Sequence, residues 1–136
     1  VPRPVTEEAF EALEAAGGYA LSWRAHGLCY GIPKAYEAAL EQGVCVVANV
    51  SRAVIPLARD LYQPLAIVKV SAPADLLRQR LIARGREGEA EIEGRIRRAG
   101  EFEVSGSDVV ELSNDSALEI GIDRLVNILR RAAGRT

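Results

Sequence analysis

The chain has no methionine and only one histidine, one tryptophan and two cysteines among its 136 residues. Cys29 and Cys45 lack the spacing of a metal site and are too few for a disulfide framework. His26 has no second histidine, cysteine or carboxylate at a useful spacing, and no third group orients it as a base for Cys29. We therefore expect no metal site, a turn role for His26 and a reducing cytoplasmic location. Because methionine is absent, we also expect that Val1 is not the natural first residue.

No apolar run approaches the roughly 20 residues of a membrane span, and no internal repeat or low-complexity segment is present. The formal net charge of −2 and the pI near 5.5 argue against general nucleic-acid binding. With 49% apolar and 26% charged residues, the composition is that of one ordinary globular domain. We expect neither a membrane nor a nucleic-acid partner, and the sequence does not determine the oligomeric state.

The apolar patterns predict an α/β domain. VCVVANV (44–50), LAIVKV (65–70) and VVEL (109–112) are continuously apolar, as expected for strands covered on both faces. Helical patterns separate them and follow the last, where Ser116 and Glu119 have the spacing of a capping box. Strands that alternate with helices predict a parallel sheet flanked by helices.

Residues 5–43 predict a smaller α+β region. Its expected elements are a helix capped by Thr6 and closed by Gly17-Gly18, strands over 19–23 and 28–30 with His26-Gly27 near their turn, and a helix from Pro33 to Gln42. Gly31 indicates either backbone that approaches a ligand or a tight bend. Trp23 and Tyr30 indicate a pocket wall or hairpin packing, two interpretations that the residues alone leave open.

Polar residues follow all three predicted buried strands, over 49–52, 71–72 and 113–115. Ligands of open parallel sheets bind beyond these carboxyl ends. Asn49, Ser51 and Arg52 offer hydrogen-bond donors and acceptors without a fixed negative charge, which favours a ligand role. The alternative is that Ser51 only caps the next helix.

Four arginines bracket the glycine that ends a predicted helix: Arg84, Arg86, Arg95 and Arg98. Guanidinium groups match phosphate oxygens, and a glycine hinge suits a moving lid. The alternative is a solvated helix with surface pairs Glu91–Arg95 and Glu93–Arg97, each worth roughly a few tenths of a kcal/mol. We assign Arg78 and Arg97 to that solvated face. The residues alone thus predict an α/β domain with an anion site.

The order of motifs resembles the guanylate kinase-like branch of P-loop nucleotide kinases over almost the whole chain. VTEEAFEALEAAGGYALSWRAHGLCYGIP resembles that family's substrate-binding region, RQRLIARGRE its lid entry, RIRRA its arginine helix and LSNDSALE the segment that contacts adenine. The resemblance implies one guanylate kinase-like domain over 1–136. Residues 5–43 would bind the acceptor, and 44–136 would form the core with a lid at about 84–98.

Within this branch, ALSWRAHGLCYGIP and VVANVSRAVIP are similar to the ribose 1,5-bisphosphate phosphokinases of phosphonate breakdown. Guanylate kinases receive the guanine donors with acidic side chains, and the corresponding positions here are Leu21, Asn49 and Ser51. Leu21 accepts no hydrogen bond, and each buried guanine donor left unpaired would cost roughly 1–3 kcal/mol. The resemblance therefore implies ATP-dependent phosphorylation of ribose 1,5-bisphosphate to 5-phosphoribosyl 1-diphosphate.

The same resemblance implies roles for particular residues, with ATP and Mg²⁺ as cofactors and a sugar phosphate as the small-molecule partner. The catalytic arginines would be Arg84, Arg86, Arg95 and Arg98. The acceptor would be bound by Arg3, Trp23, Tyr30, Asn49, Ser51 and Arg52. Asn114 would lie near adenine. No metal ligand is assigned, because Mg²⁺ would be held largely by the nucleotide phosphates.

The chain departs from the family pattern at its start. The N-terminal strand and the glycine-rich phosphate-binding loop are absent, and Pro4 runs straight into Val5-Thr6 where the family has a loop. We expect the chain to be part of a longer protein with segments missing at both places. Two other functions stay open: guanylate kinase, and a non-catalytic guanylate kinase-like module that binds a protein partner.

Overall fold

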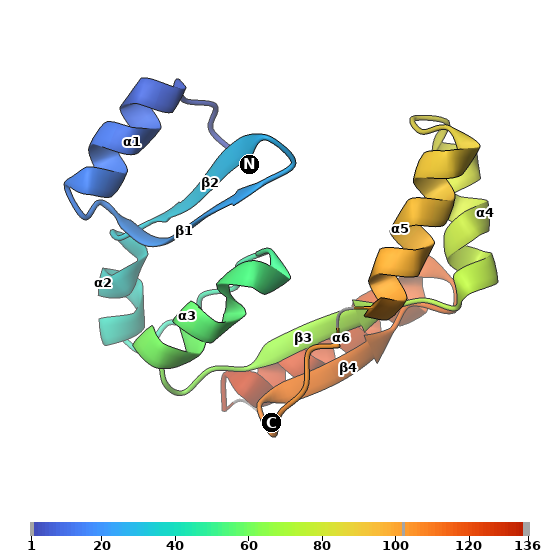
Figure 1. Cartoon of the computed structure of the whole chain (residues 1–136). Coiled ribbons are helices and arrows are strands. Elements are labelled where there is room, and N and C mark those ends of the chain that lie inside the picture. Colours follow the sequence, from blue (N-terminus) through green and yellow to red (C-terminus); the bar gives the residue numbers. More distant parts are fainter. Residues whose placement is uncertain (1, 102, 135–136) are drawn as a thin grey trace. The chain divides into compact units, whose positions relative to one another are not determined.

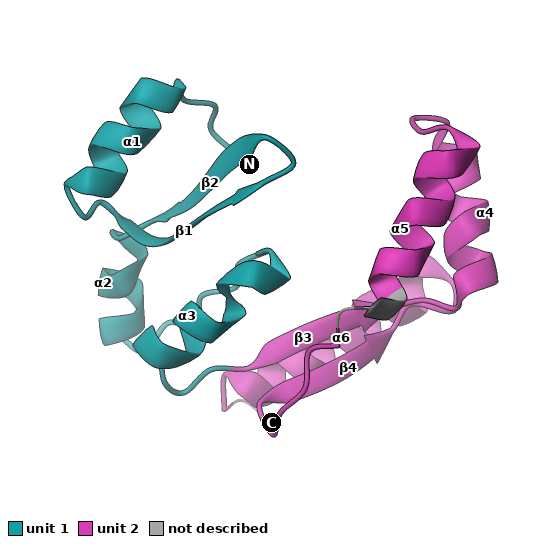
Figure 2. Cartoon of the chain, in the orientation of Figure 1, with its two compact units in different colours: residues 1–65 teal, residues 66–136 magenta. Residues whose placement is uncertain are grey.

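The computed structural model describes residues 2–101 and 103–134. The chain forms two compact units, residues 1–65 and 66–136, which are described separately (Figure 2). No helix within the described ranges is long and apolar enough to cross a membrane. Together the units give a mixed α/β protein that contains helices and a parallel sheet (Figure 1).

The first unit begins with helix α1 (Glu7–Ala15), which starts where the sequence predicts. The hydroxyl of Thr6 accepts a hydrogen bond from the Ala9 amide at 3.2 Å, and Glu7 and Glu8 carry negative charge near the positive end of the helix dipole. Phe10 is the buried residue of this helix, and its ring stacks on Tyr19 with centroids 4.7 Å apart. That stack attaches α1 to the strand that follows.

Strands β1 (Tyr19–Ala25) and β2 (Leu28–Pro33) form an antiparallel hairpin, as predicted. His26 and Gly27 form its two-residue turn, and both have positive φ (53° and 74°), the requirement of a type I′ turn. The tight-bend interpretation of Gly31 is wrong because this residue lies within β2, and the approach of its backbone to a ligand stays a prediction. A Cβ at Gly31 would lie 2.5 Å from the Tyr19 ring, so this glycine makes room for that ring.

Helix α2 (Tyr36–Glu41) follows β2, and the prediction that Pro33 opens this helix is wrong because Pro33 ends the strand. The predicted strand over 44–50 is also wrong, since these residues form no helix or strand. Val44 and Val47 are 52% and 65% exposed. A strand needs a hydrogen-bonded neighbour as well as apolar residues, and no described strand pairs with this segment.

The first unit ends with the 3₁₀ helix η1 (Arg52–Val54) and helix α3 (Ile55–Leu61). Val54, Ile55 and Ala58 are buried, and η1 packs against β1. The hydroxyl of Tyr62 donates to Glu37 at 2.7 Å and lies 3.3 Å from the carbonyl oxygen of Ala20. The chain after α3 is thereby held to α2 and to the hairpin.

The second unit is built on the parallel pair β3 (Ile67–Ser71) and β4 (Val109–Ser113). The connection between them contains α4 (Ala74–Arg84) and α5 (Glu89–Glu101), and α6 (Leu118–Ala132) follows β4 and packs against it. Leu81, Ile92 and Leu112 are its buried apolar residues. Gly85 ends α4 in the left-handed conformation (φ 63°), as the sequence predicts.

The predicted capping box at Ser116 is wrong. Helix α6 begins at Leu118 with Ala117 as its N-cap and no side-chain cap. The Ser116 hydroxyl donates instead to the Asp115 carboxylate at 2.8 Å. A charged acceptor makes the stronger hydrogen bond, so the hydroxyl serves the loop before the helix.

Candidate functional site

The carboxyl ends of β3 and β4 meet at one edge of the sheet, as the sequence predicts for two of its three polar strand ends. Ser71 pairs with Ser113 across the ladder, and the amide of Asn114 donates to the carbonyl oxygen of Ser71 at 2.7 Å. Residues 113–116 form the loop that leaves this edge, which we call the β4 exit loop. Its backbone is fixed by the sheet on one side and by side chains on the other.

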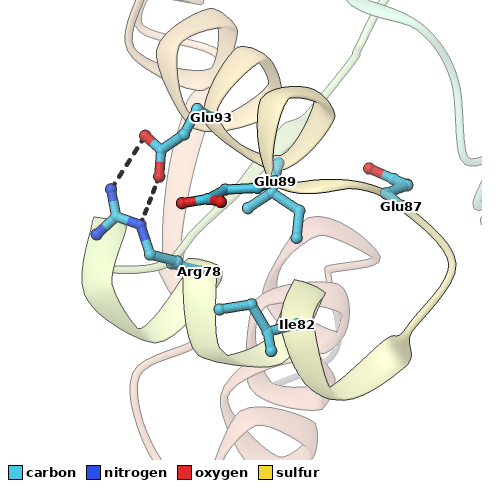
Figure 3. A pocket seen from close by; sticks show the side chains of 6 residues that line it. Arg78, Ile82, Glu87, Glu89 and Glu93 are labelled. Atoms are coloured by element: carbon cyan, nitrogen blue, oxygen red, sulfur yellow. Dashed lines mark hydrogen bonds and ion pairs between the residues drawn. The ribbon is translucent and has the colours of Figure 1, made fainter.

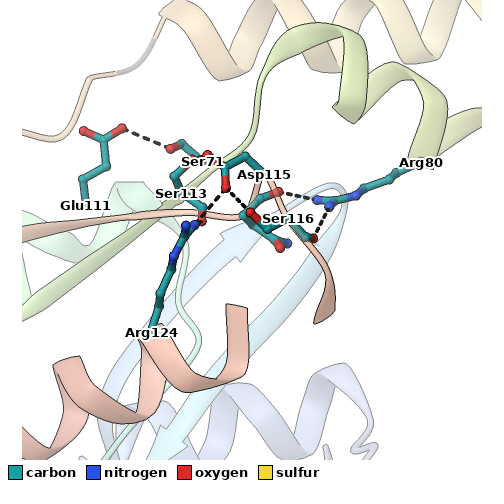
Figure 4. Close-up of polar contacts among 8 residues, drawn as sticks. Ser71, Arg80, Glu111, Ser113, Asp115, Ser116 and Arg124 are labelled. Atoms are coloured by element: carbon teal, nitrogen blue, oxygen red, sulfur yellow. Dashed lines mark hydrogen bonds and ion pairs between the residues drawn. The ribbon is translucent and has the colours of Figure 1, made fainter. Parts of the chain in front are cut away.

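Two arginines from different helices hold the β4 exit loop (Figure 4). Arg80 of α4 donates to the carbonyl oxygens of Asn114 and Ser116, at 2.6 and 3.5 Å. Arg124 of α6 donates to the carbonyl oxygen of Ser113 at 2.7 Å and to the Asp115 carboxylate at 2.8 Å. Because these bonds involve a charged donor, they are among the stronger ones a loop can receive.

Asp115 is the acceptor at the centre of this network. Its carboxylate receives Arg124, the Ser116 hydroxyl and the Ser113 hydroxyl, the last at 2.9 Å. The Arg124 guanidinium, and then the two serine hydroxyls, hold the pKa of the Asp115 carboxyl well below its ordinary value. The carboxylate therefore stays charged at neutral pH, and its bond to Arg124 holds the β4 exit loop to α6.

Asn114, predicted to lie near adenine, is half-buried in this loop. A Cβ at Gly121 would lie 3.3 Å from the Asn114 side-chain oxygen, which places that amide beside the first turns of α6. Its backbone amide and carbonyl are both engaged, with Ser71 and Arg80. The network thus fixes the backbone on which the Asn114 side chain is carried.

The four predicted catalytic arginines lie on either side of the α4–α5 connection. Arg84 ends α4, Arg86 lies in the connection, and Arg95 and Arg98 lie on α5. Two of the four share one carboxylate oxygen: Glu87 Oε1 lies 2.8 Å from Arg95 and 3.8 Å from Arg84. All four arginines are exposed, and no such shared carboxylate links Arg86 and Arg98 among the described residues. The structure therefore brings Arg84 and Arg95 together, through a residue that the sequence analysis did not single out.

Arg78, assigned to the solvated face, keeps 39% of its side chain exposed and also joins two helices. Its guanidinium binds both oxygens of Glu93, at 2.7 and 3.2 Å, and so joins α4 to α5 (Figure 3). The predicted surface pairs of Arg95 with Glu91 and of Arg97 with Glu93 are wrong, because Arg95 pairs with Glu87 and Glu93 with Arg78. A pocket of about 320 Å³ beside this pair is lined by Arg78, Ile82, Glu87, Glu89, Ile92 and Glu93.

In the first unit, the hairpin brings Trp23 and Tyr30 together as cross-strand partners. Their rings stack with centroids 5.5 Å apart and an interplanar angle of 11°. The hairpin-packing interpretation of these two residues is confirmed, while their role in a pocket wall stays a prediction. Tyr30 keeps 38% of its surface exposed although its ring is packed against Trp23.

The remaining predicted acceptor residues lie elsewhere in the first unit. Asn49 belongs to the irregular segment before η1, so its expected position at a strand end is wrong. Ser51 accepts a hydrogen bond from the Ala53 amide at 3.4 Å and so caps the helix that follows it, η1, as predicted. Arg52 begins η1, and Arg3 is exposed ahead of α1. Their binding of an acceptor stays a prediction.

Sequence reasoning missed three residues of this architecture: Glu87, Asp115 and Arg124. Asp115 could have been found from the sequence, because it belongs to the polar residues 113–115 that follow a predicted strand. Glu87 stands among arginines and glutamates that mostly face solvent, and nothing in the sequence marks it as the most buried carboxylate of its segment. Arg124 lies nine residues after Asp115, beyond the start of α6, so their contact is defined only in the folded chain.

A parallel β–α–α–β–α unit with arginines around its connections is compatible with a kinase-like α/β protein. No protein-family model matches the chain. It is similar to the ribose 1,5-bisphosphate phosphokinases PhnN of three bacteria. The identity is 46% over 126 residues for Chelativorans sp. (91% of this chain, 59% of the relative). It is 40% over 129 residues for Azotobacter vinelandii (95% and 70%) and 44% over 131 residues for Pseudofrankia inefficax (96% and 68%).

The chain therefore belongs to the ribose 1,5-bisphosphate phosphokinase family. It spans less than two thirds of the length of the Chelativorans relative and slightly more than two thirds of the other two. The identity is 40–46% over more than nine tenths of the chain, and sequences this similar share a fold in the aligned region.

Proposed function

We propose that the chain belongs to an enzyme that transfers the γ-phosphoryl group of ATP to the 1-phosphate of ribose 1,5-bisphosphate. An oxygen of the 1-phosphate would form the new bond to the γ-phosphorus, and the bond from that phosphorus to ADP would break. The products are 5-phosphoribosyl 1-diphosphate and ADP. The single observation that carries this proposal is the identity to relatives named for this activity over almost the entire chain.

The second unit would supply the nucleotide-binding groups. Phosphoryl transfer depends mainly on positioning and on neutralising charge that spreads over the phosphate oxygens. Arg84, Arg86, Arg95 and Arg98 would provide that positive charge from the lid, residues 84–98. What supports this role is the contact of Arg84 and Arg95 with one carboxylate oxygen, since two guanidiniums that share a carboxylate oxygen are spaced so that they could also share a phosphate oxygen.

Asn114 would lie near the adenine, carried by the β4 exit loop. An amide side chain can both donate to and accept from a base edge. The bonds from Arg80 and Arg124 support this role because they fix the backbone of the loop before any nucleotide binds. Such preorganisation reduces the entropy that binding would otherwise cost.

Mg²⁺ would accompany ATP and neutralise its phosphates during transfer. The part of the chain that the structure describes has no group of three or more histidine, cysteine, aspartate or glutamate side chains placed to hold a metal ion. In sites of this kind Mg²⁺ is usually held by one or two carboxylates together with substrate phosphates and water.

The first unit would supply the acceptor-binding groups. Arg3, Tyr30 and Arg52 would bind the phosphates of ribose 1,5-bisphosphate, and Trp23, Asn49 and Ser51 would surround the sugar. The stack of Trp23 on Tyr30 supports a role for Tyr30, because it fixes the ring that carries the hydroxyl while the residue stays partly exposed. A preoriented hydroxyl donates to a phosphate oxygen with little loss of freedom.

Acceptor choice is tested by isothermal titration of the full-length protein with ribose 1,5-bisphosphate and with GMP. We expect the sugar bisphosphate to bind more tightly, because Leu21 offers no acceptor to a guanine donor. Tighter binding of GMP would overturn the proposed acceptor and favour guanylate kinase. Binding of neither compound would favour a module without catalysis.

Tyr30→Phe tests the acceptor role of the hairpin. The variant keeps the ring that stacks on Trp23 and removes only the hydroxyl, so the fold should be preserved. Loss of one hydrogen bond to a charged phosphate predicts an increase of about 10-fold or more in the KM for ribose 1,5-bisphosphate, with the KM for ATP unchanged. An unchanged acceptor KM would remove Tyr30 from the site.

A further inference from the structure

Glu87 supplies the carboxylate of the α4–α5 connection, and this side chain is largely enclosed. Its side chain is 13% exposed, whereas the Arg84 and Arg95 guanidiniums that it contacts are about half exposed. Both contacts use Oε1, and Oε2 is buried without a hydrogen-bond partner within the described part of the chain. Figure 3 shows Glu87 on the connection itself, away from the Arg78–Glu93 pair. An ion pair that only stabilised the surface would not need a carboxylate oxygen to be buried without a hydrogen-bond partner, because such burial costs free energy.

We propose that Glu87 is a positioning residue that occupies Arg84 and Arg95 in the place of a phosphate until nucleotide binds. The inference rests on the proposed function, because it takes these two arginines as phosphate ligands. A carboxylate and a phosphate present similar oxygens to the same guanidinium edge, so they compete for it. Glu87 therefore keeps the two arginines in one place without ATP and is displaced from them when the polyphosphate arrives.

The location of Glu87 permits that displacement. It lies two residues after Gly85, whose left-handed conformation (φ 63°) ends α4 and whose added Cβ would meet no atom within 4 Å. The backbone there has the freedom to change direction. Arg78 and Glu93 hold α4 to α5 independently of Glu87, so release of Glu87 does not separate the two helices.

If Glu87 competes with phosphate for the two arginines, removal of its charge should strengthen phosphate binding. Glu87→Gln keeps the size of the side chain and removes the charge that competes with phosphate. Binding of ATP, and of inorganic tripolyphosphate as a probe without a base or sugar, should become about two- to fivefold tighter, the effect of releasing one partly exposed ion pair. A residue that merely stabilises the connection would weaken binding when altered.

Glu93→Gln is the matched control. It removes an equal charge from the same pair of helices, but its partner is Arg78, which has no proposed phosphate role. Both variants change the net charge of the protein by one, so a general electrostatic effect on anion binding appears equally in both. Glu87→Gln in an Arg95→Ala background should give less than half of the gain in affinity, because the principal arginine for which Glu87 and phosphate compete is gone.

The experiment is calorimetric titration of tripolyphosphate and ATP into the full-length protein and these variants, beside initial rates of 5-phosphoribosyl 1-diphosphate formation. Tighter binding in Glu87→Gln alone supports the inference. Unchanged or weaker binding in folded Glu87→Gln, or equal gains in Glu93→Gln, overturns it. Absence of product from the unaltered protein contradicts the proposed function instead, and the tripolyphosphate titration still decides the role of Glu87.

Discussion

Phe10→Ala should destabilise the first unit more than any other truncation in α1. Phe10 is 2% exposed and stacks on Tyr19, and the Tyr19 ring in turn fills the space left by Gly31. The Arg24 guanidinium lies 5.8 Å from the centre of the Phe10 ring. Removing a buried phenyl ring costs about 3–5 kcal/mol, a large share of the roughly 5–15 kcal/mol of a typical domain. Phe10→Leu keeps most of the buried volume and should cost about 1–2 kcal/mol.

The assay is denaturant unfolding followed by the fluorescence of Trp23, the only tryptophan of the chain, which lies in the hairpin that Phe10 supports. Leu13→Ala is the control within α1, because Leu13 is 44% exposed and its truncation should cost about 1 kcal/mol or less. Since the same hairpin carries Tyr30, Phe10→Leu should raise the KM for the acceptor more than that for ATP. A loss in Phe10→Ala no greater than that in Leu13→Ala would refute this account of the packing.

Two further predictions concern pH. The pKa of Asp115 is lowered in the folded state, chiefly by Arg124, so its contribution to stability is present above its unfolded pKa near 4 and is lost as pH falls further. Asp115→Asn should therefore lower the free energy of unfolding at pH 7 and make little difference in strong acid; an equal effect of Asp123→Asn would contradict this. Burial, and then the bond to Glu37, raises the pKa of Tyr62 to about 12, so its contribution is present below pH 10 and is lost between about pH 10 and 12. The tyrosinate absorbance that Tyr62→Phe removes should have its midpoint near pH 12, and a midpoint near the ordinary value of about 10 would show that the hydroxyl is neither buried nor bound to Glu37 in solution.

Local rules predicted much of the fold. The Thr6 cap, the His26-Gly27 turn and the Gly85 helix end each depend on the conformation or hydrogen bonding of a few adjacent residues, and all three are confirmed. The parallel pairing of β3 with β4 is confirmed as well, because a helical connection between two apolar strands leaves few other topologies.

Contacts between distant residues were beyond such rules. The apolar run over 44–50 indicates a preference for burial, but it does not specify a strand partner, and none of the described strands supplies one. Ser116 has the right spacing for a capping box, yet the neighbouring Asp115 carboxylate binds its hydroxyl. Arg78 contacts Asp75 of its own helix at 3.4 Å, but its shortest bond is to Glu93 of α5 at 2.7 Å. Arg95 pairs with Glu87 of the connection, a partner that only the packing of α4 and α5 defines.

The measurement that tests the account most directly is the fate of a labelled γ-phosphoryl group. The full-length protein would be mixed with γ-labelled ATP, Mg²⁺ and equal concentrations of ribose 1,5-bisphosphate and GMP, and the products separated. We expect label in 5-phosphoribosyl 1-diphosphate, and loss of that label when Arg84 and Arg95 are both replaced by alanine. Label in GDP alone, or undiminished transfer by the double variant, would contradict it.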